Sequence, residues 1–339
     1  MTTQTHRTWL LSSRPTGEPT LENFEQVERE VPTPGAHEVL IEGRYYSVDP
    51  YMRDRISPED SYAGSWNPGE PMRGGVVGEI VESNHPEYEV GDIVKGLLEW
   101  AEYCLSDGTT LERVDPELAP ISTALGVLGP TGRTAYFGLL DVGEPRPGET
   151  VLVSGAAGAV GSIVGQIARL NGCRVVGIAG SDEKIAWLTD DLGFDAGINY
   201  KTTDDIHAAV GAACPDGVDV YFDNVGGEIT DAAFAHLNTG SRVAVCGQIA
   251  LYNDAEMPDG PRKLWKLLET QSQVRGFLLP EFEGRYDEAT ERLAEWVDSG
   301  AIEYTETVTD GFDNLPTAFA GLFEGTNIGK QLVRVTDAE

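Results

Sequence analysis

Positive charge is the property that this sequence has least of. Its 339 residues contain 24 lysines and arginines, of which six are lysine, against 56 aspartates and glutamates, and the formal net charge is −32. A surface of this sign repels the phosphate backbone of nucleic acids and anionic lipid headgroups. No apolar run approaches the roughly 18 residues that a membrane span requires. We therefore expect neither a nucleic-acid partner nor a membrane partner.

Cysteine and histidine are also scarce. The four cysteines lie at least 32 residues apart, and no CxxC pair occurs. This spacing favours neither a zinc ribbon nor a thioredoxin-like redox motif. None of the five histidines has a cysteine at useful spacing in the N-terminal region, so we expect no metal site. The N-terminus lacks the apolar segment of a signal peptide, which together with the cysteine usage predicts a cytoplasmic protein.

The acidic residues are spread along the whole chain rather than collected in a tail. A globular protein of this charge repels itself in dilute buffer, whereas at molar salt the Debye length falls to ~3 Å and the repulsion is screened. The composition therefore predicts a halophilic protein, adapted to a high-salt cytoplasm. An acidic surface for a cationic partner would instead predict a local cluster of acids, which the sequence does not show.

Two kinds of patterning divide the chain near residue 150. The earlier part has short β-rich runs between Gly, Pro and Asp breaks, which predict a small barrel or sandwich. Later, apolar strands alternate with helical stretches, which predicts an α/β fold with a doubly wound parallel sheet. The six expected strands of that sheet are residues 150–154, 174–179, 195–199, 218–223, 242–246 and 274–279.

A glycine-rich turn follows the first of these strands. In the G-x-G-x-x-G frame its key positions are Ala156, Gly158 and Gly161, so the first glycine is replaced. The second glycine lets the backbone approach a pyrophosphate, and the third lets helix and strand pack closely. The following helix presents free N–H groups to the anion. The turn predicts a dinucleotide site, with a glycine-rich turn that binds nothing as the alternative.

The end of the second strand favours NADP over NAD. An NAD site places an acid about 20 residues after the turn to hold the ribose 2′-OH, but the corresponding residue here is Gly180. Lys184, at the start of the next helix, supplies charge for a 2′-phosphate. The alternative is a surface lysine paired with Glu183 or Asp191. We predict NADPH as the cofactor.

With these features the chain resembles the medium-chain dehydrogenase/reductase superfamily. Its motifs are similar to those of the zinc-free branch that contains leukotriene B4 12-hydroxydehydrogenase/prostaglandin reductase and plant alkenal double-bond reductases. They run nearly end to end and include Val48-Asp49-Pro50-Tyr51-Met52-Arg53, Gly180-Ser181-Asp182-Glu183-Lys184, Asn199-Tyr200-Lys201, Asp223-Asn224-Val225-Gly226-Gly227 and Asn327-Ile328-Gly329-Lys330. The resemblance implies a Rossmann NADP-binding domain at residues 126–301. It also implies a β-rich, GroES-like barrel domain, the catalytic domain, built from residues 1–125 and 302–339.

The resemblance implies the site residues as well. Lys184 and Tyr200 are similar to the residues that bind the 2′-phosphate. Tyr51 and Tyr252 resemble residues that line an enone pocket and are the catalytic candidates. The remaining cofactor contacts would be Gly158, Ala159, Val160, Gly161, Asn224, Cys246, Gly247, Gln248, Ile249, Ala250, Leu251, Tyr252, Phe277, Leu278, Leu279 and Asn327.

The implied reaction is the NADPH-dependent reduction of the carbon–carbon double bond of α,β-unsaturated aldehydes or ketones. Hydride goes to the β-carbon, and either the ribose 2′-OH of the cofactor or Tyr252 stabilises the enolate oxygen. One residue departs from the family pattern: Arg133 replaces an apolar residue near the expected nicotinamide, unless its side chain turns to solvent. The alternatives are a quinone reductase on the same scaffold and a non-catalytic NADPH-binding sensor.

The resemblance further implies a homodimer. The expected sixth strand would pair edge to edge with its copy across a two-fold axis. Val274, Phe277, Leu278 and Leu279 make this strand too apolar for a bare edge.

Overall fold

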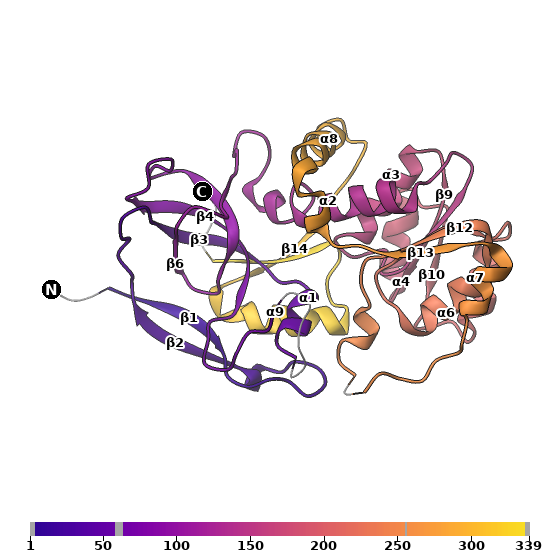
Figure 1. The fold of residues 1–339 in the computed structure, drawn as a ribbon, viewed down its shortest axis with the longest axis horizontal. Helices are drawn as coiled ribbons and strands as arrows, with labels where there is room; N and C mark the ends of the chain where they lie inside the picture. The colour runs from indigo at the N-terminus through magenta and orange to yellow at the C-terminus, as the bar shows by residue number, and fades with distance from the viewer. Residues whose placement is uncertain (1–3, 58–63, 255, 336–339) are drawn as a thin grey trace. The chain divides into compact units, whose positions relative to one another are not determined.

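The computed structural model describes residues 4–57, 64–254 and 256–335, and the chain divides into two compact units (Figure 1). Unit 1 comprises Met1–Leu125, Glu306–Asn327 and Gln331–Glu339, and unit 2 comprises Gly126–Thr305 and Ile328–Lys330. Within the described residues, no helix has the length and apolar character that crossing a membrane requires.

Unit 1 is built on antiparallel strands. A two-stranded sheet pairs β1 (Thr5–Leu11) with β2 (Phe24–Glu30). A seven-stranded sheet has the order β14 (Glu306–Asp310), β15 (Lys330–Arg334), β3 (Val39–Ser47), β4 (Arg73–Ser83), β5 (Ile93–Glu99) and β7 (Glu112–Arg113), with β6 (Tyr103–Ser106) paired to β3. Its pairs β3–β4, β4–β5 and β3–β6 are antiparallel, which confirms the predicted β-rich domain.

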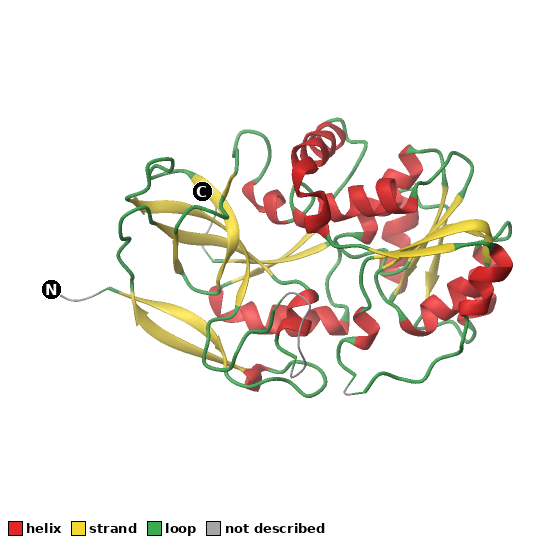
Figure 2. Ribbon diagram, viewed as in Figure 1, coloured by secondary structure: helices red, strands yellow, loops and turns green. Residues whose placement is uncertain are grey.

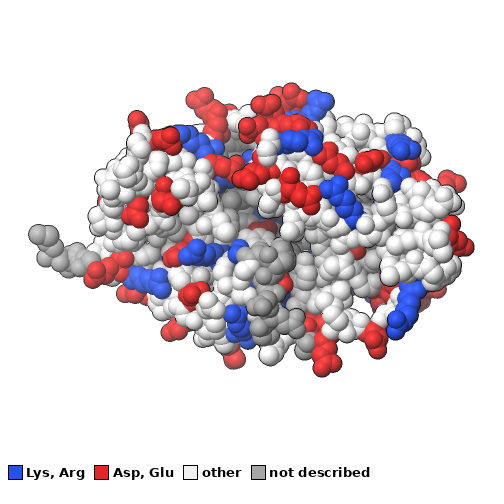
Figure 3. Space-filling view, in the orientation of Figure 1, with Lys and Arg blue, Asp and Glu red and all other residues white. Residues whose placement is uncertain are grey.

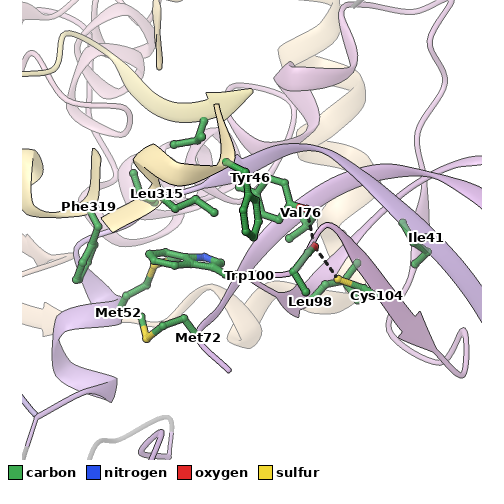
Figure 4. Packing of buried hydrophobic residues seen from close by; sticks show 14 of the residues in the cluster. Ile41, Tyr46, Met52, Met72, Val76, Leu98, Trp100, Cys104, Leu315 and Phe319 are labelled. Carbon is green, nitrogen blue, oxygen red and sulfur yellow. Dashed lines mark hydrogen bonds between the residues drawn. The ribbon is translucent and has the colours of Figure 1, made fainter. Parts of the chain in front are cut away.

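The core of unit 1 joins both ends of the chain. Figure 4 shows the fully buried Trp100 between Tyr46 and Met52 of α1 (Tyr51–Arg55), with Phe319 of α9 (Leu315–Glu324) beside it. The rings of Trp100 and Phe319 meet edge to face at 6.2 Å. The Tyr46 hydroxyl donates to the carbonyl oxygen of Ala101 at 2.6 Å, so the one polar atom of this buried ring is satisfied. Burial of these aromatic surfaces explains why residues after 305 return to the N-terminal unit.

Unit 2 contains a six-stranded parallel sheet. Its strands follow the order β10 (Ala196–Asn199), β9 (Arg174–Ala179), β8 (Thr150–Val153), β11 (Val218–Asp223), β12 (Leu237–Val245) and β13 (Gln273–Gly276). In chain order this is 3-2-1-4-5-6, the doubly wound arrangement of dinucleotide-binding sheets. The predicted fold class is therefore confirmed. The order reverses between β8 and β11, and ligands of such sheets bind at the carboxyl ends of the strands at this switch point.

Helices cover the sheet of unit 2 on either side, as Figure 2 shows. The helices of this unit are α2 (Pro130–Phe137), α3 (Gly161–Leu170), α4 (Asp182–Ala186), α5 (Ile206–Ala213), α6 (Gly227–Ala235), α7 (Leu264–Thr270) and α8 (Tyr286–Asp298), of which α8 packs on α2. Because both faces are covered, the central strand β8 is an apolar run with all four residues buried, whereas the edge strand β13 is exposed at all four positions.

The sixth strand is shorter than predicted. β13 ends at Gly276, so the predicted strand is wrong over residues 277–279. The Phe277 side chain turns into the core, where its ring lies 6.1 Å from that of Phe222. Leu279 then begins a short 3-10 helix whose first turn contains Pro280, a residue that cannot donate to a strand ladder.

Acidic side chains are distributed over the face of the molecule seen in Figure 3, with basic side chains between them. No single acidic cluster dominates that view, which agrees with the even spread of acids along the chain.

Candidate active site

The glycine-rich turn between β8 and α3 leaves no room for side chains at its third glycine. A Cβ on Gly161 would lie 2.4 Å from the carbonyl oxygen of Gly155, so helix and strand approach as closely as the fingerprint requires. Alanine is accommodated at the first position because Gly177 on β9 faces it. A Cβ on Gly177 would lie 3.0 Å from the Cβ of Ala156. The replaced glycine is thus compensated on the neighbouring strand.

The segment Ile328–Lys330 of unit 2 runs beside this turn. Gly329 N donates to the carbonyl oxygen of Ala157 at 2.8 Å, and Gly329 forms an isolated parallel bridge with Gly158. Gly329 has φ +66°, and a Cβ there would lie 1.9 Å from the carbonyl oxygen of Thr305. Two glycines therefore allow the backbone packing around the phosphate turn: Gly161 within the turn and Gly329 on the neighbouring segment.

The carboxyl ends of β9 and β10 bring the proposed 2′-phosphate residues together. Asn199 pairs with Ala179 across these strands, and Tyr200 N donates to the Ala179 carbonyl at 3.1 Å. A Cβ on Gly180 would lie 3.2 Å from the Tyr200 hydroxyl oxygen. The position that carries an acid in NAD sites is therefore filled by the Tyr200 side chain, which fits a phosphate rather than a free ribose hydroxyl.

Lys184 lies in the first turn of α4, whose N-cap Ser181 accepts a hydrogen bond from Lys184 N at 3.3 Å. Burial lowers the pKa of the Lys184 ammonium, and the nearby charge of Lys201 lowers it further. Asp182 is engaged elsewhere, because Asn199 Nδ2 donates to its carboxylate at 2.7 Å. The Asp182 carboxylate is thus held by Asn199, while Lys184 adds a positive charge to the start of α4.

Asp223, at the end of β11, is the structural centre of the switch point, and sequence reasoning assigned it no role. The side chain is completely buried and accepts six hydrogen bonds. Oδ1 accepts from Ser154 Oγ, Tyr221 OH, Val225 N and Gly226 N, and Oδ2 accepts from Thr230 Oγ1 and Gln248 Nε2. The carboxylate thereby joins the exit of β8, the start of α6 and the loop after β12.

Asn224 and the loop after β12 complete this region. Asn224 Nδ2 donates to the Ser154 carbonyl at 2.7 Å, and Cys246 N donates to the Asp223 carbonyl at 2.8 Å. Further along the loop, the Tyr252 hydroxyl accepts a hydrogen bond from Gln248 N at 3.2 Å. The structure therefore gathers three of the predicted cofactor segments, at residues 158–161, 224 and 246–252, around the carboxyl ends of β8, β11 and β12.

The other predicted residues are placed differently. Phe277 is 7% exposed and its ring packs in the core, whereas Leu278 is 50% exposed. Tyr51, at the start of α1, is partly buried against the core of unit 1. Asn327 also belongs to unit 1, and follows α9. Tyr51 and Asn327 are thus outside the unit that carries the phosphate turn.

Arg133 on α2 is buried, with 5% exposure, so the alternative of a side chain turned to solvent is wrong. Its guanidinium lies 4.7 Å over the ring of Tyr286, and Nε donates to Thr290 Oγ1 at 2.9 Å. Both partners belong to α8, which explains why an arginine is tolerated at a position that is usually apolar. Cation–π stacking and a hydrogen bond offset the cost of its burial.

The cysteines are free thiols. Burial raises the pKa of the Cys246 thiol, beside the predicted cofactor loop, to about 12, and Asp223 contributes to this shift. In the described ranges, no three His, Cys, Asp or Glu side chains gather into a group that would hold a metal ion.

Comparison with known proteins identifies the chain. The family described as N-terminal domain of oxidoreductase matches residues 7–114, and the family described as zinc-binding dehydrogenase matches residues 159–295. The NADPH-dependent curcumin reductase of Escherichia coli is 44% identical over 337 residues, covering 98% of this chain and 97% of the relative. Prostaglandin reductase 1 of Rattus norvegicus is 44% identical over 333 residues, covering 97% and 98%.

A third relative and a solved structure show the same similarity over most of the chain. The NADP(+)-dependent 2-alkenal reductase of Nicotiana tabacum is 42% identical over 304 residues, covering 89% of this chain and 88% of the relative. The crystal structure of CurA from Vibrio vulnificus in complex with NADPH has a TM-score of 0.94 and 42% identity, covering 98% of this chain and all of that one. The fold and the site define an NADP-dependent oxidoreductase. More closely, the chain belongs to the zinc-free medium-chain dehydrogenase/reductase branch that contains the prostaglandin, curcumin and alkenal reductases.

Proposed function

We propose that this NADPH-dependent reductase reduces the carbon–carbon double bond of α,β-unsaturated aldehydes or ketones. The observation that carries the proposal is the similarity, over nearly the whole chain, to a reductase named for 2-alkenals. Tyr252, on the loop after β12 at the switch point, supplies a hydroxyl that suits this reaction. We assign NADP binding to residues 126–301 and the catalytic β-rich domain to residues 1–125 and 302–339. The two compact units support this division.

The residues of unit 2 suit this chemistry. Bound NADPH supplies the hydride, so the chain has to position the cofactor and stabilise charge. The turn at Gly158–Gly161 holds the pyrophosphate, and Lys184 with Tyr200 holds the 2′-phosphate. The Tyr252 oxygen accepts from Gln248 N, which orients the hydroxyl, and its own proton is donated toward the developing enolate oxygen. Tyr51 is the second candidate for contact with the substrate.

The test is NADPH oxidation, followed at 340 nm in molar KCl, with a matched set of a 2-alkenal, an enone, a quinone and a saturated aldehyde. We expect turnover of the alkenal and enone, with products two mass units heavier and the carbonyl intact. Faster turnover of quinones, or no turnover of any compound while NADPH binds, contradicts the proposal. The first result favours a quinone reductase and the second a cofactor sensor.

A pair of tyrosine variants separates catalysis from cofactor binding. Tyr252→Phe should lower kcat about tenfold to a hundredfold, since removing one oxyanion donor costs up to about 10²–10³ and a cofactor hydroxyl shares the task here. Its Kd for NADPH should stay within about twofold, because phenylalanine keeps the ring and removes only the hydroxyl. Tyr200→Phe is the matched control and should raise the KM for NADPH with kcat preserved. A Tyr252→Phe enzyme with unchanged kcat would remove Tyr252 from the reaction.

We also propose a homodimer formed through the edge of the unit 2 sheet. β13 is the last strand of that sheet, and Val274 is 41% exposed on it. Nearby α7, which packs on β12, exposes Leu264, Trp265 and Leu268. An edge strand with an exposed valine, close to a helix with exposed apolar side chains, is a candidate pairing site. Light scattering at working salt should give twice the 36.6 kDa chain mass, and Val274→Lys should shift it toward the monomer.

A further inference from the structure

Lys201 directly follows the predicted 2′-phosphate residue Tyr200 at the end of β10. We infer that Lys201 is a second cation of the 2′-phosphate site, which acts with Lys184 to select NADPH over NADH. The inference rests on the proposed cofactor site and adds to it a specificity-determining residue that neither the motif reasoning nor the comparisons assign.

Strand register places Lys201 at this site. Because β9 and β10 are parallel and Asn199 lies opposite Ala179, the residues after both strands emerge at the same edge of the sheet. A Cβ on Gly180 would lie 3.2 Å from Lys201 Cε, as close as it would lie to the Tyr200 hydroxyl. The aliphatic stem of Lys201 therefore passes directly over the glycine that replaces the NAD-specific acid.

The side-chain amide of Asn199 supports this position of Lys201. Asn199 Oδ1 accepts from Lys201 N at 3.1 Å, while Asn199 Nδ2 donates to the Asp182 carboxylate at 2.7 Å. The first bond fixes the backbone of Lys201 beside Gly180. The second holds the Asp182 carboxylate, at the start of α4, against Asn199. Lys201 therefore lies over Gly180 while the Asp182 carboxylate is bound elsewhere.

The charge distribution suits an anionic ligand beside the two lysines. The chain has six lysines and a net charge of −32, yet two of the six are close enough for the charge of Lys201 to lower the pKa of Lys184, which Glu183 in turn raises. Two positive charges held close together attract a doubly charged anion more strongly than either charge does alone. A 2′-phosphate carries about −1.5 to −2 at pH 7, so one ammonium leaves it incompletely neutralised and two match it.

High salt makes a second contact more important. At 1 M salt the Debye length is ~3 Å, so distant cations contribute nothing and only groups touching the phosphate discriminate. Lys201 and Lys184 approach from two elements, the end of β10 and the first turn of α4, and thus contact different phosphate oxygens. Each direct charged contact is expected to be worth about tenfold in affinity.

The experiment measures binding rather than turnover. Titration calorimetry in 1 M KCl compares adenosine 2′,5′-bisphosphate with 5′-AMP, which lacks the 2′-phosphate, on the wild-type protein and on Lys201→Gln, Lys201→Arg and Lys184→Gln. Lys201→Gln should raise the Kd for the bisphosphate about tenfold and change that for 5′-AMP less than twofold. Lys201→Arg keeps the charge and should restore affinity to within about threefold of wild type.

Lys266→Gln is the matched control, because it removes one lysine charge from the same unit at an exposed pair with Glu269. It should leave both Kd values unchanged. If Lys184→Gln weakens bisphosphate binding and Lys201→Gln does not, the inference is wrong and the proposed cofactor site stands. If neither variant distinguishes the two ligands, the cofactor site itself is wrong. An equal loss for both ligands in Lys201→Gln, or an equal effect of Lys266→Gln, also overturns the inference, since it shows a general effect of charge.

Discussion

Replacing Asp223 by asparagine is the sharpest test of how the switch point is held together. The substitution keeps the shape of the side chain and removes its charge. Four donors converge on Oδ1, and an asparagine oxygen in that position keeps all of them. The new NH₂ group then takes the place of Oδ2. Thr230 can turn its hydroxyl to accept from it, but Gln248 presents an NH₂ group of its own.

The cost follows from this count. The charge-assisted hydrogen bond from Gln248 Nε2 is lost, which costs about 1.5–3 kcal/mol. The new amide group at position 223 and the amide group of Gln248 would then be two buried donors facing each other, and leaving them unsatisfied costs about 1–3 kcal/mol. Flipping the Gln248 amide relieves that contact and gives up its bond from Nε2 to the Gly247 carbonyl. We therefore expect Asp223→Asn to lower the free energy of unfolding by about 3 kcal/mol. Asp223→Ala would leave six donors without an acceptor, and the loss would be a large part of a typical free energy of unfolding of about 5–15 kcal/mol. Asparagine is the informative variant because the protein should still fold.

The assay is urea unfolding at constant molar KCl, with hydrogen exchange of the Val225 and Gly226 amides as the local readout. Both amides should stay protected in Asp223→Asn, because the asparagine oxygen keeps their hydrogen bonds. The Kd for NADPH should rise because the Gln248 side chain is released. Asp219→Asn is the matched control on the same strand. Among the residues that the structure describes, Asp219 accepts hydrogen bonds from Thr150 N and Asn238 Nδ2, so about 1 kcal/mol is expected there. A loss for Asp223→Asn no larger than this control would refute the reasoning.

Three further predictions concern the whole chain. Burial raises the pKa of Cys104 to about 12 and of Cys173 and Cys214 to about 11, so iodoacetamide at pH 7.5 should label none of these thiols in the native protein; mass spectrometry showing native labelling would contradict this. Prolonged chelation should leave the rate of NADPH oxidation unchanged, and activity that zinc restores would overturn the expectation of no metal. The melting temperature should fall below about 0.5 M KCl as screening weakens, whereas a constant value from about 0.05 to 2 M would disprove the high-salt interpretation.

Patterns that are local in the sequence predicted the fold well. The six strands of unit 2 and the phosphate turn each lie within a dozen residues, where periodicity and glycine spacing act directly. Two strands depart from the prediction: β12 begins at Leu237 rather than at residue 242, and β13 ends at Gly276. Phe277 continues an apolar run, yet its side chain packs against Phe222 more than fifty residues away, and this contact ends the strand.

Features that depend on distant partners were not visible in the sequence. Ala156 departs from the fingerprint, and its compensation by Gly177 is a contact between neighbouring strands. Arg133 finds its partners on α8, more than 150 residues along the chain. Asp223 stands in a motif that was recognised, but its donors come from separate segments that only the folded sheet brings together. Sequence reasoning can find such residues when a charged side chain ends a run of apolar residues, as Asp223 does after Val220-Tyr221-Phe222.

Arginine and lysine have different roles in this protein because their side chains differ chemically. Arginine presents a planar fork that binds carboxylates through two bonds, and Arg242 holds Glu149 in this way while also donating to the Gly143 carbonyl. Lysine is a compact, strongly hydrated point charge on a flexible stem, better suited to a phosphate. In a chain with six lysines, Lys201 lies over Gly180 and is close enough to Lys184 to lower its pKa, while the acids lie spread over the surface in view (Figure 3). A surface of this charge repels an anionic cofactor at long range. Affinity must then come from contacts within a few ångströms, and these are the interactions that molar salt leaves intact.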